Sequence, residues 1–410
     1  MEVLYRRCAG IDVSKKDAKV CVRIQGSGRR RTSSEVTTWG ATTNQILALR
    51  DHLEAAKVEA VVIESTGAYW KPFYYLLEED LKLILVNARE AKTVPGRKTD
   101  VADAAWLADL GAHGLVRASF VPPPPIRELR DLTRLRTTVL RDRAREWQRL
   151  EKLLEDAQIK LSSVVTDLAG VSSLAILEAM TSGQTDPERL ARLARGKLKV
   201  KHHQLVEALT GRFNDHHRFL ARLHLSRIQA HTANAAELEA AIEQAMLPFH
   251  AAQDLLCSIP GIDIVIADVI IAETGADMTV FPTAAHLCAW AGTSPGLHQS
   301  AGTNVPVKTR HGNAHLKAAL GMAAFNIAKQ HNSYLSARYR RLAARRGKKR
   351  AIVATERAIL TAIWHMLTDG TFYQDPGPDY YLKHNPARRA NQAIRELTSL
   401  GYQVTLVKAA

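Results

Sequence analysis

The sequence predicts an α/β domain at the N-terminus followed by a mainly helical region. Two observations favour this fold class. Over residues 1–121, short apolar runs typical of strands first follow one another closely and then alternate with amphipathic helical patterns. Beyond the proline run at 122–125, apolar residues instead recur at spacings of three and four, which is typical of helices. The 410 residues, of which 46% are hydrophobic, are enough for two or three domains with buried cores.

The first domain, expected over residues 1–121, is predicted to contain a mixed sheet with helices on its faces. A polar turn at Ser14–Lys16 separates two apolar runs, which predicts a hairpin. The later strands alternate with helices, and this order is that of a ribonuclease H-like fold. The expected elements are strands within 8–24 and at 35–38, 60–63 and 83–86, and helices at 43–56, 71–79 and from about residue 99.

The second region, residues 122–250, is predicted to form a long coiled-coil arm. Apolar residues recur at coiled-coil spacing from Leu129 to Leu161 and again over Leu220–Phe249. Between these runs lies a basic, helix-rich insert that includes residues 189–203. Two long helices joined by such an insert suit an arm for self-association or for holding nucleic acid.

The third region, residues 251–375, is expected to be mainly helical. Ser258–Ile262 reads S-I-P-G-I and precedes an apolar helix, which resembles a helix–hairpin–helix whose turn can contact a DNA phosphate. Asp263 stands where such a motif usually has a second glycine. Because a carboxylate repels phosphate, we expect this segment to have the helix–hairpin–helix geometry but not to contact a phosphate. A glycine-rich loop at 292–312 and further helices follow, and residues 376–410 are expected to form a loosely ordered tail.

The charge balance predicts a polyanionic partner. A formal net charge of +15 favours nucleic acid, because neutralising phosphates releases counterions. Tyr334 and Tyr339 lie beside the most basic segment and are candidates for stacking on unpaired bases. That segment, residues 338–350, contains no acid, and its eight basic residues are Arg338, Arg340, Arg341, Arg345, Arg346, Lys348, Lys349 and Arg350. We find no apolar stretch long enough for a transmembrane helix and no secretory signal, so we expect a cytoplasmic protein.

Neither the cysteines nor the histidines predict a metal site. The four cysteines, Cys8, Cys21, Cys257 and Cys288, are far apart and form no C-x-x-C pair, so we expect reduced thiols that lie mostly in the core. His217, His224 and His231 share a heptad face, but no cysteine or carboxylate completes a zinc set. We expect these histidines to pack in the arm.

Four carboxylates in the first domain predict metal-dependent chemistry on a phosphodiester. Asp12 and Glu64 each end an apolar run, whereas Asp100 and Asp103 open a helix and share one of its faces. An acidic first helical turn alone reflects the helix dipole. Acids at two strand ends together with such a pair, however, can converge on Mg²⁺, with Mn²⁺ as an alternative. Flanking basic residues that can contact phosphates are Lys15, Arg97 and Lys98, of which Lys98 is the best candidate.

Several short motifs carry a resemblance to a known family. G-I-D-V-S-K at 10–15, I-E-S-T-G at 63–67 and K-T-D-V-A-D-A at 98–104 resemble the Asp-Glu-Asp-Asp RuvC-like domain of the IS-one-ten family of insertion-sequence transposases. The downstream half is similar to the second domain of that family. The matching stretches there are S-I-P-G-I at 258–262, A-W-A-G-T-S-P at 289–295 and S-A-G at 300–302.

The resemblance implies a transposase and site-specific DNA recombinase that is guided by a structured bridge RNA and acts on target and donor DNA in a bacterial cytoplasm or nucleoid. By motif, the metal ligands would be Asp12, Glu64, Asp100 and Asp103. Ser300 would be the nucleophile that forms a covalent phosphoserine intermediate. The family acts as a dimer that pairs into a tetramer, with carboxylates from one protomer and the serine from another.

Other interpretations remain open. A RuvC-like nuclease or Holliday-junction resolvase would act by hydrolysis, and it needs neither the arm nor the serine domain. A proofreading exonuclease usually begins D-x-E, whereas Val13 and Ser14 follow Asp12. An actin-like ATPase or sugar kinase would need a second glycine-rich phosphate loop, which is absent. The chain could also be a non-catalytic nucleic-acid-binding scaffold, and Ser294 is a rival to Ser300 in the same loop.

Overall fold

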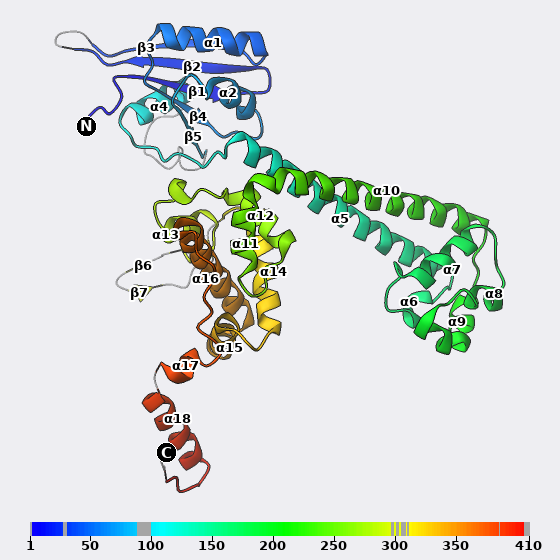
Figure 1. The fold of residues 1–410 in the computed structure, drawn as a ribbon. Helices are drawn as coiled ribbons and strands as arrows, with labels where there is room; N and C mark the ends of the chain where they lie inside the picture. Colours follow the sequence, from blue (N-terminus) through cyan, green and yellow to red (C-terminus); the bar gives the residue numbers. More distant parts are fainter. Residues whose placement is uncertain are drawn as a thin grey trace. The chain divides into compact units, whose positions relative to one another are not determined.

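The computed structural model describes residues 2–27, 31–87, 100–296, 299–300, 303–304, 309, 311–384 and 386–405 (Figure 1). Packing divides the chain into two compact units, Met1–Val121 and Pro122–Ala410. Among the described residues, none of the helices is both long enough and apolar enough to cross a membrane.

The first unit is built on a five-stranded mixed sheet with the strand order β3-β2-β1-β4-β5. β1 pairs with β2, and β2 with β3, in antiparallel fashion, whereas β1–β4 and β4–β5 are parallel pairs. The predicted α/β class is therefore confirmed for this part of the chain. The strands are β1 (Arg7–Val13), β2 (Asp17–Ile24), β3 (Ser33–Gly40), β4 (Ala60–Glu64) and β5 (Leu83–Val86).

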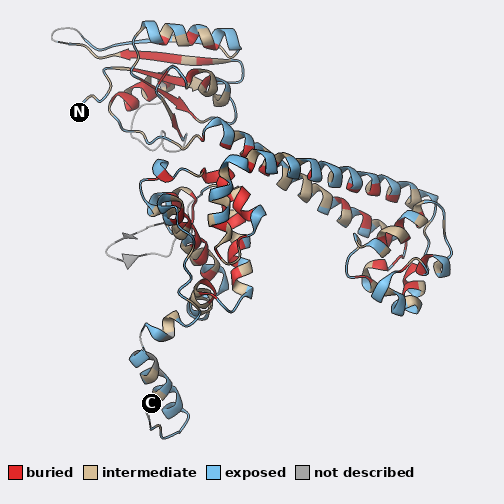
Figure 2. Ribbon diagram, viewed as in Figure 1, coloured by how far each residue is buried: buried red, intermediate tan, exposed pale blue. Residues whose placement is uncertain are grey.

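Helices cover both faces of this sheet. Alternate residues of a strand point to opposite faces, so β1 contributes Ile11 to one core and Cys8 to the other. The first core includes Leu49 and Phe73 from the helices α1 (Thr43–Ala55) and α2 (Trp70–Leu77), and the second includes Leu107 from α4 (Asp100–Ala112). Figure 2 shows the central strands as buried. Cys8 is a free, buried thiol, and burial raises its pKa to about 12.

Two long antiparallel helices dominate the first part of the second unit (Figure 1). They are α5 (Pro124–Asp156) and α10 (Asp215–Met246), and Arg136 of α5 pairs with Glu239 near the far end of α10. A cluster of small helices, here called the arm tip, joins them and shares a core with their ends that includes Leu150, Leu205 and Leu225. The tip helices are α6 (Leu161–Val164), α7 (Val171–Thr181), α8 (Pro187–Ala191), η1 (Gly196–Lys201) and α9 (His202–Leu209).

The proline run at 122–125 directly follows the first unit, which ends at Val121. Rather than only breaking regular structure, it also starts α5, with Pro123 at the N-cap and Pro124 as the first helical residue. Proline suits that position because the first helical N–H has no partner within the helix. The long helix thus begins at the boundary between the two units.

The rest of the second unit is a helical bundle. In its hairpin between α11 (His250–Cys257) and α12 (Ile264–Thr274), Asp263 caps α12 by accepting a hydrogen bond from the Ile266 amide at 2.9 Å. Gly261 has φ +88°, and a Cβ there would lie 2.9 Å from the Ala323 carbonyl oxygen, so only glycine fits the turn. The elements are η2 (Leu247–Phe249), α11 (His250–Cys257), α12 (Ile264–Thr274), η3 (Met278–Val280), α13 (Ala284–Trp290), β6 (Gln299–Ser300), β7 (Thr303–Asn304), α14 (Ala314–Lys329), α15 (Tyr334–Arg346) and α16 (Lys348–Asp369).

The C-terminal segment differs from the loosely ordered tail that the sequence predicts. It contains the short helix α17 (Tyr380–Lys383) and the longer helix α18 (Pro386–Ser399). α18 is strongly amphipathic, with Ile394 and Leu397 on one face. The many charged and polar residues of this segment therefore form the solvated face of a helix.

Candidate catalytic site

Asp12 and Glu64 lie at the carboxyl ends of neighbouring parallel strands. The register between β1 and β4 pairs Ile11 with Ile63, and each acid is the next residue along its strand. The Glu64 side chain is buried and accepts a hydrogen bond from Thr66 Oγ1 at 3.3 Å. The carboxyl ends of adjacent parallel strands meet at one edge of a sheet, which is where open α/β sheets place their ligands.

Two glycines determine how α4 lies on the sheet. A Cβ on Gly10 would stand 2.2 Å from the Ala104 carbonyl oxygen and 2.4 Å from the Ala108 amide nitrogen, so the helix backbone lies directly on β1. One turn further on, a Cβ on Gly111 would stand 2.4 Å from a methyl group of Val62 in β4. Since Gly10 precedes Asp12 by two residues, the N-terminal end of α4 is directed toward the edge that bears the two strand-end acids.

This packing places the start of the α4 backbone near that edge. Asp103 directly precedes Ala104, and Asp100 is the first residue of the helix, one turn earlier. The side chain of Asp100 and all of Lys98 and Arg97 lie outside the described residues, while Lys15 is exposed in the β1–β2 turn. The four predicted acids thus come from three adjacent elements of the first unit.

Metal binding by these acids stays a prediction. Among the side chains that the structure describes, no three from His, Cys, Asp and Glu lie close enough together to hold a metal ion. Mg²⁺ is usually bound through one or two carboxylates together with waters and substrate phosphates. The chemistry of the set, carboxylates at a strand edge, fits a metal that is completed by phosphate oxygens.

Ser300 lies in the second unit, in a short hairpin. Its backbone pairs with Thr303 across β6 and β7, while its side chain and the whole of Ala301 and Gly302 lie outside the described residues. The rival Ser294 is half-buried at the start of the same loop. Downstream, Asn313 caps α14 and accepts hydrogen bonds from the amides of the first helical turn, at 3.0 Å in each case.

A buried carboxylate that the sequence analysis missed holds Asn313. Glu273 of α12 has no exposed surface, and Arg134 of α5 donates two parallel hydrogen bonds to it, each of 2.8 Å. Asn313 Nδ2 donates to the same carboxylate at 2.6 Å, and Arg130 donates to the Ala272 and Glu273 carbonyl oxygens. Burial alone would raise the pKa of Glu273, but these hydrogen bonds and arginine charges outweigh it and lower the pKa.

The basic cluster at 338–350 divides into a packed part and an exposed part. Tyr334 stacks on Tyr381 rather than standing free, and Arg341 lies over the Tyr381 ring at 4.6 Å from its centre. Arg338 is partly buried beside the same tyrosines, and Arg340 bonds to His331 at 2.6 Å. The exposed residues of the cluster are Arg341, Arg345, Arg346, Lys348, Lys349 and Arg350.

Two family models match the chain. A model for the DEDD transposases of IS110 (IS-one-ten) elements matches residues 9–159. Its description is Transposase. A second model, described as Transposase IS116/IS110/IS902 family, matches residues 253–340. The first segment contains the acidic edge of the sheet, and the second contains the hairpin of Ser300 and the Glu273 contacts.

Two curated proteins of insertion elements are similar to the chain. The uncharacterized 43.6 kDa protein of IS110 from Streptomyces coelicolor is 34% identical over 143 residues, which cover 34% of this chain and 35% of that protein. The matching region therefore spans about a third of that relative. The uncharacterized 42 kDa protein of IS900 from Mycobacterium paratuberculosis is 25% identical over 399 residues, which cover 89% of this chain and 96% of that protein.

Proposed function

Because the chain belongs to the IS110 family of transposases, we propose that it cuts and exchanges DNA strands through a covalent serine intermediate. The observation that supports the proposal is that Asp12 and Glu64 follow paired residues of neighbouring parallel strands while α4 packs against β1, within the segment that matches the DEDD transposases. The proposed catalytic residues are Asp12, Glu64, Asp100, Asp103 and Ser300.

The acids would hold Mg²⁺ or Mn²⁺, which withdraws charge from the phosphate under attack. The Ser300 hydroxyl oxygen forms a bond to phosphorus, and the bond from phosphorus to one sugar oxygen breaks. The serine proton passes to a carboxylate or water, and the departing sugar oxygen takes up a proton. The resulting phosphoserine retains the energy of the phosphodiester, so a sugar hydroxyl of another strand can reverse the step and rejoin the DNA.

The proposed partners are target and donor DNA, a structured bridge RNA and further copies of the chain. The net charge of +15 supports polyanionic partners. Lys15, Lys98 and the basic cluster at 338–350 are the proposed phosphate contacts. Ser300 and the acids belong to separate compact units, which is compatible with a composite site in a dimer that pairs into a tetramer.

The test is a reaction of the full chain with candidate bridge RNA, target DNA and donor DNA in Mg²⁺. We expect a protein–DNA adduct that survives denaturation. Ser300→Ala and Asp12→Ala should each abolish this adduct. Ser294→Ala is the matched control, because it removes a hydroxyl from the same loop and should leave the adduct intact.

The outcomes separate the competing functions. An adduct that persists in both Ser300→Ala and Asp12→Ala would overturn the composite site, and its loss in Ser294→Ala alone would move the nucleophile to Ser294. Free DNA ends without an adduct would support a hydrolytic RuvC-like nuclease or resolvase. Binding without cleavage in Mg²⁺ and Mn²⁺ would support a scaffold.

A further inference from the structure

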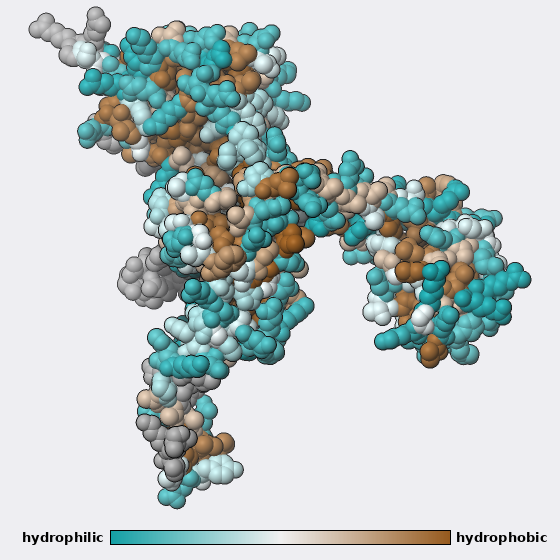
Figure 3. Space-filling model, in the orientation of Figure 1, coloured by the Kyte–Doolittle hydropathy of each residue, from teal (hydrophilic) through white to brown (hydrophobic). Residues whose placement is uncertain are grey.

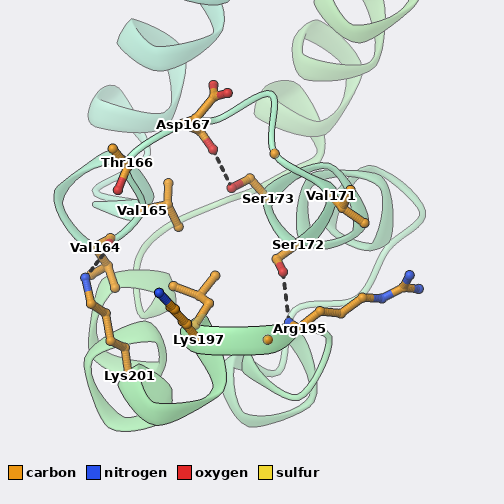
Figure 4. Close-up of a pocket in the computed structure, with 13 residues that line it drawn as sticks. Val164, Val165, Thr166, Asp167, Val171, Ser172, Ser173, Arg195, Lys197 and Lys201 are labelled. Atoms are coloured by element: carbon orange, nitrogen blue, oxygen red, sulfur yellow. Dashed lines mark hydrogen bonds between the residues drawn. The ribbon is translucent and has the colours of Figure 1, made fainter.

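The arm tip contains a cavity of about 460 Å³ that none of the proposed catalytic residues lines (Figure 4). One wall is the segment from the end of α6 into the first turn of α7, residues 164–173, and the other is η1 with the residue before it, residues 195–201. Its volume falls in the range of small-ligand sites, roughly 300–1,000 Å³. The cavity is therefore large enough for one nucleotide.

The walls of this cavity are aliphatic and its rim is cationic. Val165, Val171 and Leu198 supply apolar surface. Arg195, Lys197 and Lys201 are among the lining residues, and the Arg195 side chain extends away from Lys197 in Figure 4. Lys201 Nζ donates a hydrogen bond to the Val164 carbonyl oxygen at 3.0 Å. Aliphatic surface can contact the face of a base, and positive charge attracts its phosphate.

Hydrogen bonds hold the two walls together. The Arg195 backbone amide donates to Ser172 Oγ at 2.8 Å, and the bond from Lys201 to Val164 also crosses between the walls. Within the first wall, Ser173 Oγ donates to the Asp167 carbonyl oxygen at 2.9 Å. The Asp167 carboxylate, the acid among the lining residues, points away from Lys197 in Figure 4 and accepts a bond from the Ala169 amide. Hydrogen bonds thus fix the shape of the cavity, and the Asp167 carboxylate points away from its basic residues.

The surrounding charge favours an anion. Residues 189–201 contain six basic residues and no acid. Arg189 pairs with Asp186 at 3.4 Å, whereas the described residues offer neither Arg195 nor Lys197 an acidic partner. The positive end of α7 also lies at the cavity, since α7 begins at Val171 without a side-chain cap from the described residues. Figure 3 shows the arm tip as largely hydrophilic with smaller apolar areas.

From this combination we propose that the cavity binds an unpaired nucleotide of the nucleic-acid partner. The base lies against the Val171 and Leu198 side chains, and its phosphate lies beside Lys197. A fully paired duplex cannot enter, because its bases are stacked in the helix. The proposal rests on the proposed function for the existence of a nucleic-acid partner, but it concerns binding alone.

Equilibrium binding of the full chain to four labelled hairpins tests the proposal. Two are RNA and DNA hairpins of one sequence with a single bulged nucleotide, and two are their fully paired counterparts. Lys197→Ala removes a rim charge, and Lys199→Ala is its control, since it removes the same charge from the same helix outside the cavity. Val171→Trp fills the cavity, and Val200→Trp adds the same bulk at a residue that is 91% exposed and outside it.

We expect Lys197→Ala and Val171→Trp each to weaken binding of a bulged hairpin about tenfold, while Lys199→Ala and Val200→Trp weaken it less than threefold. A photoreactive base at the bulge should crosslink to residues 164–173 or 195–201. The RNA and DNA probes identify the source of the nucleotide, and the tighter one is the ligand.

Equal losses in Lys197→Ala and Lys199→Ala, together with no effect of Val171→Trp, would overturn the cavity as a binding site and leave a diffuse charge effect. Equal affinity for bulged and paired hairpins would overturn it as well. These results are independent of catalysis. If the wild-type chain forms no covalent adduct yet discriminates the bulge through Lys197 and Val171, the proposed chemistry fails while the cavity proposal stands.

Discussion

Removing Arg134 should destabilise the contact between helix α5 of the arm and helix α12 of the bundle. In Arg134→Ala, the buried carboxylate of Glu273 loses two hydrogen bonds of 2.8 Å and its closest positive charge. Leaving a buried charge without its partner costs about 3–5 kcal/mol. Arg130, at 3.4 Å, and Asn313, at 2.6 Å, still face the carboxylate, so we expect a value near the lower limit, about 3 kcal/mol.

Hydrogen exchange measures this effect locally, which suits a chain that need not unfold in a single step. Asn313 binds Glu273 and caps α14, so the loss should reach the amides of His315 and Leu316. About 3 kcal/mol corresponds to roughly 100-fold faster exchange. Arg145→Ala is the matched control on the same helix, because its pair with Asp142 is largely exposed and should contribute less than about 1 kcal/mol.

The effect should depend on pH in a defined direction. The folded pKa of Glu273 lies below its unfolded value of 4.5, so ionised Glu273 contributes stability above that pH and loses it as the pH falls through the folded pKa. The difference between the wild type and Glu273→Gln should therefore be largest at neutral pH and shrink in acid. If Arg134→Ala matched Arg145→Ala, or if the difference grew in acid, the reasoning about a charged buried joint would be refuted.

Three further predictions concern packing, burial and charge. Gly10→Ala should lower the stability of the first unit by about 2–3 kcal/mol, because its methyl group meets the backbone of α4, and an unchanged melting temperature would contradict that packing. Burial raises the pKa of Glu356 by more than the nearby Lys317 charge lowers it. Oε2 of Glu356 has no hydrogen bond from the described residues. Glu356→Gln should therefore raise the melting temperature at pH 7, with no gain below about pH 4.5, and a drop at pH 7 would contradict it. Nucleic-acid affinity should fall steeply with salt, and a flat response would remove the argument from charge.

The sheet is predictable from sequence because its signals are local. Polar Ser14–Lys16 between two apolar runs determines a hairpin, and the short apolar runs at 60–63 and 83–86 correspond to strands with buried neighbours. The start of α5 is less predictable, because proline ends a helix in its interior yet begins one at its first residue. In α18, the spacing of Ile394 and Leu397 among charges was the available signal for a helix.

The contacts within the arm, and those that join it to the bundle, are not predictable in the same way. Glu273 ends an apolar pattern, but its partner Arg134 is 139 residues away. His224, for which the sequence offered no carboxylate, bonds to buried Glu146 at 2.8 Å from the opposite helix of the arm. Burial of Glu146 opposes ionisation, but the bonds from His224 and Arg149 lower its pKa. Such pairs depend on tertiary packing, whereas the roles of Ser300 and the four acids depend on the family resemblance.

The length of the arm helix α5 sets the distance between the bundle and the arm tip. Arg134 of α5 contacts Glu273 of the bundle, and α5 ends at Asp156 beside the arm tip. Between these two residues an α-helix rises about 33 Å, at roughly 1.5 Å per residue. That length equals about one turn of duplex DNA, roughly 34–36 Å. A nucleic-acid partner that contacted both the bundle beside Arg134 and the arm tip would therefore have its two contact points about 33 Å apart. Adding two helical turns to both α5 and α10 would preserve the facing of the tip but shift this spacing by about 10 Å, or about three base pairs.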